Sequence, residues 1–165
     1  MKTKSIILLA VISILICSCG TTSSVSYRPS PDMTVHCIQL AGNGDCLVSI
    51  QETGVNRVLA TDAAKRSAVY QLLFVGIQGS TENRIQPIPP LIKNANVQQK
   101  ESSYFNSFFK DGLYQNYVEV LPGSVPSVAR IGNGYKVALT IVLKKESLRK
   151  KLESDNIIKS LLDVI

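Results

Sequence analysis

The sequence is poor in the residues that enzyme sites most often use. It has no tryptophan and one histidine, His36, among 165 residues, although histidine is the side chain best suited to proton transfer near neutral pH. It also contains no G-x-S-x-G nucleophile motif, no phosphate-binding glycine loop and no dinucleotide fingerprint. Motifs therefore give no reason to propose an enzyme, and we predict no catalytic residue and no cofactor.

Long apolar runs are missing as well, since a membrane-spanning helix needs roughly 17–25 apolar residues. The N-terminal run Ile6–Ile16 has about eleven residues, interrupted only by Ser13. Lys2 and Lys4 precede it and supply the positive start that is typical of an export signal. The beginning of the chain thus indicates export rather than a retained membrane span.

The end of this run reads Ile16-Cys17-Ser18-Cys19-Gly20 and resembles the lipobox of bacterial lipoproteins. With Cys19 as the modified residue, aliphatic Ile16 stands three positions before it and small Ser18 one position before it. The resemblance implies a signal peptide over residues 1–18 and a lipid on Cys19, where each buried CH₂ adds about 0.8 kcal/mol of membrane affinity. A plain secretory signal with two unrelated cysteines is the alternative.

The residues after the signal divide into a polar stretch and a domain. Residues 19–32 are rich in Ser, Thr and Pro and predict a flexible tether, whereas residues 33–165 predict a single domain. Removing residues 1–18, which include Lys2 and Lys4, lowers the net charge from +6 to +4. Because no basic residues alternate with aromatic ones, we expect no nucleic-acid partner.

Two pairs of β-rich segments flank turns of glycine and asparagine. The first pair is Met33–Ala41 and Cys46–Glu52, and the second is Val125–Ile131 and Tyr135–Leu143. Each pair predicts a β-hairpin because β-branched and apolar residues surround a short turn signal.

The segment after the first hairpin carries the clearest helical pattern. Small and apolar residues recur there at helical spacing, namely Ala60, Ala64, Ala68, Leu72 and Val75. Asp62 is predicted to cap the start of this helix and Gly76 to end it. With a short helix before Gly112 and a C-terminal helix, the pattern predicts an α+β domain. Its antiparallel sheet is built from two hairpins, with helices packed on one face.

Two cysteines, Cys37 and Cys46, lie in the first hairpin. Export to an oxidising compartment allows a disulfide between them. A turn at Leu40–Asn43 would place them opposite each other, a turn at Ala41–Gly44 would place them diagonally, and two reduced buried thiols are the alternative. His36 and Cys37 are adjacent on a strand and should point to opposite faces, so they do not predict a catalytic pair. We predict no metal site at this turn.

Residues 78–99 form a proline-rich stretch followed by most of the aromatic residues. This density of proline excludes a helix or a central strand and predicts a long loop, either functional or mobile. The loop and the aromatic residues together predict a surface for a partner or ligand, with core packing of the aromatic residues as the alternative. The residues assigned to this surface are Pro87, Pro89, Pro90, Tyr104, Phe108 and Tyr114.

Three stretches resemble small envelope lipoproteins of Gram-negative bacteria with a domain related to the N-terminal part of the flagellar assembly T protein. They are ATDAAKRSAVYQLLFVGI, FFKDGLYQNYVEV and YKVALTIVLKKESLRKKLES. The resemblance implies an assembly role in the envelope and carries no catalytic residues.

The expected function is therefore that of a lipid-anchored, non-catalytic interaction module with an envelope protein as partner. The absence of an acidic residue in GTTSS after Cys19 favours the periplasmic face of the outer membrane. A ligand-binding lipoprotein and a small cell-wall hydrolase are the alternatives.

Overall fold

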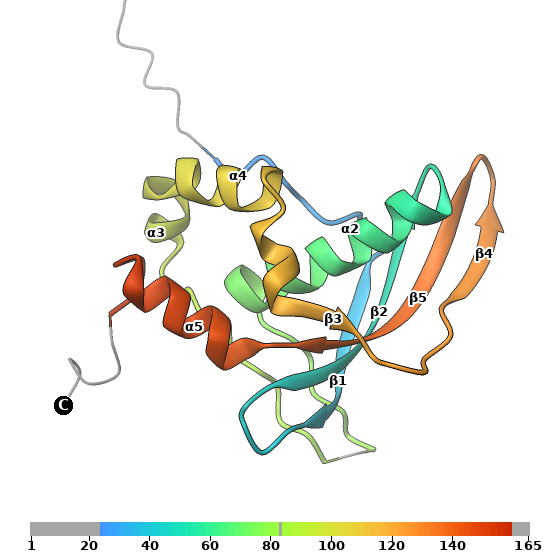
Figure 1. The fold of residues 1–165 in the computed structure, drawn as a ribbon, viewed down its shortest axis with the longest axis horizontal. Coiled ribbons are helices and arrows are strands. Elements are labelled where there is room, and N and C mark those ends of the chain that lie inside the picture. The colour runs from blue at the N-terminus through green and yellow to red at the C-terminus, as the bar shows by residue number, and fades with distance from the viewer. Residues whose placement is uncertain (1–23, 83, 160–165) are drawn as a thin grey trace, which may run out of the picture.

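The computed structural model describes residues 24–82 and 84–159, which form an antiparallel five-stranded sheet with helices (Figure 1). The strand order is β1-β2-β5-β3, and β4 also pairs with β5. The elements in chain order are β1 (Thr34–Leu40), β2 (Cys46–Gly54), α2 (Arg57–Tyr70), the π-helical turn η1 (Gln71–Val75), α3 (Ala95–Lys100), α4 (Ser102–Lys110), the 3₁₀ turn η2 (Leu113–Tyr117), β3 (Val118–Val120), β4 (Ser127–Ile131), β5 (Gly134–Leu143) and α5 (Lys145–Ser154). The predicted α+β class and both predicted hairpins are confirmed.

One face of the sheet forms the core because alternate residues of the central strands point toward the helices. Val48 and Ile50 of β2 lie opposite Ile141 and Leu139 of β5, and all four side chains are buried. The helix α2 runs across this face (Figure 1). Side chains of α4 and α5 join the same core cluster. The helices therefore cover one face of the sheet, as predicted.

Helix α2 lies unusually close to β2 because small residues face the sheet. A Cβ atom added at Gly54 would lie 2.6 Å from the backbone nitrogen of Ala60. Ala60, Ala64 and Ala68 are themselves fully buried. The row of alanines noted in the sequence is thus the face that packs on the sheet.

The two ends of α2 differ from the sequence prediction. Asn56, not Asp62, caps the start, since its side chain accepts a hydrogen bond from the Leu59 backbone nitrogen at 2.9 Å. The helix then widens into the π-helical turn η1, in which the Gly76 nitrogen donates to the Gln71 carbonyl at 2.7 Å. Gly76 ends the helix as predicted, with a φ of 97° that favours glycine.

The predicted tether over residues 19–32 is wrong for residues 24–27. Val25 is buried, and the Ser26 backbone nitrogen donates to the Asn106 side chain at 2.7 Å. The ring of Tyr27 contacts that of Phe109, with centroids 5.3 Å apart. Residues 24–27 thus pack on the domain, because Val25 is buried and Tyr27 contacts both α2 and α4. Residues 19–23, including Cys19, lie outside the described part.

The first hairpin adopts neither of the two registers considered from the sequence. Leu40 pairs with Cys46 and Cys37 pairs with Val48, with an irregularity between Cys37 and Gln39. Because Leu40 already pairs with Cys46, Cys37 lies too far along β1 to face Cys46, and the bulge does not bring the two cysteines opposite each other. Both are free, buried thiols rather than a disulfide. Burial raises the pKa of Cys46 to about 11 and also raises the pKa of Cys37.

Candidate functional site

The predicted proline–aromatic surface is divided between two regions of the molecule. Pro87 and Pro89 are exposed and line a groove beside β1, and Pro90 lies next to Gly76. Phe108 and Tyr114 are only 2% and 1% exposed and belong to the core. The aromatic residues therefore follow the core-packing alternative, because α4 turns its aromatic face toward α2, η1 and η2.

Tyr104 is the least buried of the three predicted aromatic residues. Its ring contacts Phe105 and Phe108, and its hydroxyl donates to Asp155 at 2.6 Å. Burial, followed by this hydrogen bond, raises the pKa of Tyr104. Its contacts hold α4 against the end of α5, so its evident role is structural.

A groove beside β1 forms a concave part of the described surface, with a volume of about 1460 Å³. Residues 33–36 of the β1 region form one wall, and residues between 75 and 89 form the other. The second wall doubles back on itself through paired backbone bonds between Ile77 and Ile88, at 2.8 and 2.9 Å. One bond, from the Cys37 nitrogen to the Gln78 carbonyl at 2.9 Å, joins the two walls.

The π-helical turn explains why the second wall lies where it does. Leu91 donates to the Leu72 carbonyl at 3.0 Å, and Ile92 donates to the Leu73 carbonyl at 2.9 Å. These acceptors are available to the proline-rich segment because the widened turn shifts them out of the regular helical pattern. The same turn leaves Val75 60% exposed at the groove, although the helical spacing placed it on the buried row.

The groove is lined by apolar and polar side chains in about equal measure and has a weak positive character. Met33, Val35, Val75 and several Ile and Pro side chains line it, together with Arg84 and His36. No Asp or Glu is among the lining residues in the part of the chain that the structure describes. Such a surface suits an extended chain that carries apolar side chains.

His36 and Cys37 point to opposite faces of the sheet, as the alternation along a strand predicts. His36 is exposed and pairs with Ser49, whereas Cys37 is fully buried and pairs with Val48. Within residues 24–82 and 84–159, no group of three His, Cys, Asp or Glu side chains is placed to hold a metal ion.

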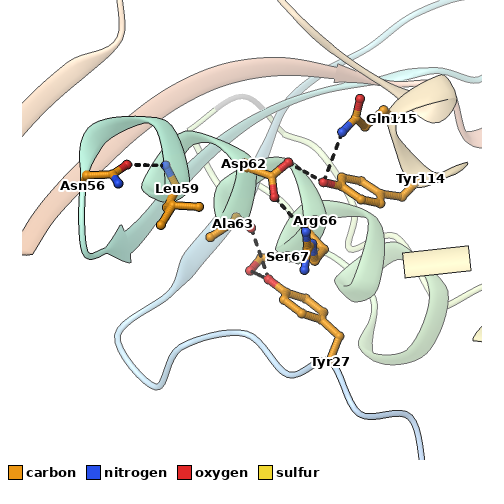
Figure 2. A network of polar contacts seen from close by, with 9 residues as sticks. All are labelled: Tyr27, Asn56, Leu59, Asp62, Ala63, Arg66, Ser67, Tyr114 and Gln115. Atoms are coloured by element: carbon orange, nitrogen blue, oxygen red, sulfur yellow. Dashed lines mark hydrogen bonds and ion pairs between the residues drawn. The ribbon is translucent and has the colours of Figure 1, made fainter. Parts of the chain in front are cut away.

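A separate network of polar side chains lies between α2, η2 and the N-terminal segment (Figure 2). Arg66 forms an ion pair with Asp62 at 2.8 Å, and Tyr114 donates a hydrogen bond to the same carboxylate. The Arg66 guanidinium lies over the rings of Tyr27 and Tyr114, at 5.1 and 5.2 Å from their centroids. This arrangement fastens η2 and the N-terminal segment to the exposed side of α2.

The inner part of the network contains a buried carboxylate. Ser67 donates to Glu52 at 2.5 Å, and the Tyr27 hydroxyl lies 2.7 Å from the Ser67 oxygen. Glu52 is 1% exposed and Ser67 is fully buried, so a dissolved substrate does not reach them. Burial raises the pKa of Tyr27 to about 12. We interpret this network as a set of hydrogen bonds that satisfies the buried carboxyl group of Glu52, and no local sequence pattern indicates it.

No helix within the described residues combines the length and apolar character needed to cross a membrane. No protein-family model, curated protein or solved structure matches this chain.

Proposed function

We propose that this protein is a lipid-anchored, non-catalytic interaction module of the bacterial cell envelope whose groove beside β1 receives an extended segment of a partner protein. The observation that carries the proposal is the groove itself, which is open, lined by apolar and polar side chains together and bordered by a sheet-edge strand. Edge strands and exposed apolar surfaces are common sites of protein association.

The size of the groove favours a protein segment over a small molecule. Sites for small ligands are usually enclosed and of roughly 300–1,000 Å³, whereas this groove is open and holds about 1460 Å³. The ligand-binding alternative would require a more enclosed cavity. The hydrolase alternative would require accessible acid–base groups, and the buried pair Glu52 and Ser67 does not offer them.

The lipobox supports the placement of the module at a membrane. Cys19 is separated by residues 20–23 from Ser24, after which the chain packs on α4. Five residue steps span at most about 17 Å. A lipid on Cys19 would therefore keep α4 near the membrane surface, and the module would meet partners at the envelope rather than at a distance.

Site-specific photocrosslinking in living cells tests this proposal. A benzophenone amino acid replaces exposed Val75 in the groove, and the matched control places it at exposed Ser147 on α5. We expect one envelope protein to crosslink from position 75 and not from position 147, and the yield to fall when Cys19→Ala releases the protein from the membrane. Equal crosslinking from both positions, or none from position 75, would overturn the proposal.

A further inference from the structure

A second surface lies at the end of the molecule formed by the β4–β5 hairpin and the start of α2 (Figure 1). It combines exposed valines with two arginines and a tyrosine. We define this hairpin-end surface by Val55, Arg57, Val58, Val128, Arg130 and Tyr135. It is separate from the groove beside β1, whose lining includes none of these residues.

The residues of the hairpin-end surface are brought together by strand register and by the position of α2. Arg130 pairs with Tyr135 across the hairpin, and the Arg57 guanidinium lies 5.5 Å from the centre of the Tyr135 ring. A shallow hollow of about 380 Å³ between α2 and β5 includes Val58 and Tyr135. Val55 and Val58 are 74% and 77% exposed. Tyrosine and arginine beside apolar side chains are typical of the residues that dominate binding at protein interfaces.

Strand β4 has an unpaired backbone edge at the same end of the molecule. It pairs only with β5 among the described strands, so its other edge is open. Ile131 and Gly134 flank the two-residue turn and pair with each other. Because hydrogen-bonded and non-hydrogen-bonded pairs alternate in a hairpin, Arg130 and Val128 direct their N–H and C=O groups away from β5.

The positive charge of the hairpin-end surface favours an acidic strand as the partner of β4. Arg57, Arg130 and the neighbouring Lys136 have no carboxylate partner within the residues that the structure describes. Antiparallel pairing of β4 with a second copy of itself, centred on Arg130, would place the two Arg130 side chains directly opposite each other, and like charges at such positions destabilise a sheet. A strand that carries carboxylates matches the surface better.

We propose that the hairpin-end surface binds an acidic β-strand of another protein, which adds to the open edge of β4 and places carboxylates beside Arg130 and Arg57. The added strand forms backbone hydrogen bonds with Val128 and Arg130 and sets an apolar side chain beside Val128. The site goes beyond the groove and gives the module a second point of attachment. Helix α4, to which Ser26 is hydrogen-bonded, lies toward the other end of the molecule (Figure 1), so this surface faces away from the proposed anchor.

The probe for this proposal is a synthetic peptide of alternating valine and glutamate with blocked ends, titrated into residues 19–165 carrying Cys19→Ala. We expect backbone amide NMR shifts in residues 127–131 and 55–58 and no shifts at the groove. A peptide of alternating valine and lysine should not bind. Arg130→Glu should weaken binding at least tenfold, and Lys150→Glu on exposed α5 is the matched charge control, with unchanged binding.

A second variant separates strand addition from charge attraction alone. Val128→Pro removes an outward-pointing N–H while leaving the surface charge unchanged, and should also weaken binding at least tenfold, with circular dichroism confirming the fold. Absence of peptide binding, shifts elsewhere only, self-association through β4, or anionic phosphatidylglycerol vesicles shifting the same amides would each overturn the proposal. Val75→Glu should not affect this binding, so failure here is distinguishable from failure of the groove.

Discussion

Carboxylates held by tyrosine hydroxyls occur at two places where the sequence predicted an exposed aromatic surface. Tyr114 donates to Asp62, and Tyr104 donates to Asp155. A hydrogen bond from Lys151, followed by that from Tyr104, lowers the pKa of Asp155. The sequence predicts that these tyrosines contact a partner. In the structure their rings pack with the core residues, and their hydroxyls donate hydrogen bonds to carboxylates at the margin of the core.

Tyr104→Phe should lower the free energy of unfolding at pH 7 by about 1 kcal/mol, because one hydrogen bond to an ionised carboxylate is lost. Since the pKa of Asp155 is lowered in the folded state, the stabilisation is present above the unfolded pKa. It is lost as the pH falls through the folded pKa. Urea denaturation from pH 7 to pH 2.5 should therefore show the two proteins converging at acidic pH. A constant difference across this range would contradict the assignment.

The proline-rich segment is an integral part of the fold although it contains little regular structure. Ile88, Leu91 and Ile92 are buried, and the backbone of residues 91 and 92 bonds to the π-helical turn. The prediction of a loop without helix or central strand is confirmed up to α3, which begins at Ala95. The sequence predicts a loop that is either functional or mobile. The structure shows instead a segment that packs on the core and also forms one wall of the groove.

Ile92→Ala should lower the free energy of unfolding by about 3 kcal/mol, because it leaves a cavity in a well-packed core. Lys93→Ala is the matched control, since Lys93 is exposed and next in the chain, and it should change the stability by less than about 0.5 kcal/mol. Urea midpoints of the two variants test the prediction. Equal midpoints would show that the segment is not fastened to the core.

At the scale of the whole molecule, the proposed anchor and the two proposed binding surfaces lie at different places. The N-terminal segment enters beside α4, whereas the groove lies beside β1 and the hairpin-end surface at the end of the β4–β5 hairpin (Figure 1). A short link from Cys19 to Ser24 would orient the domain because the chain is packed from Val25 onward. Both proposed binding surfaces would then remain accessible on an anchored molecule.

Cys19→Ala should move the protein from the membrane to the soluble fraction, because the acyl chains supply the membrane affinity. Fractionation with a salt wash, followed by immunoblotting, measures the distribution. Ser18→Ala is the control, since it keeps a small residue before Cys19 and should leave the protein on the membrane. Continued tight association of the Cys19→Ala variant would contradict the lipid anchor.

The local sequence patterns were sufficient to predict the helices and strands but not the caps, bulges and turns that connect them. Both hairpins, the alanine face of α2 and the helix stop at Gly76 follow from spacing and turn chemistry. The bulge in β1, the Asn56 cap and the π-helical turn were not predicted. Each of these depends on which hydrogen-bond partner is available in three dimensions, and short-range propensity does not specify that choice.

The sequence by itself determined the α+β class and the alternation that separates His36 from Cys37, and it predicts the lipid anchor. These are properties of neighbouring residues, set by helical and strand periodicity and by a short motif. Only the tertiary structure decided that Tyr27 belongs to the domain, that Phe108 and Tyr114 lie in the core, and that Val75 borders a groove. Packing between segments far apart in the chain decides which apolar side chains are covered, because the free energy of burial depends on what lies against each residue rather than on its neighbours in sequence.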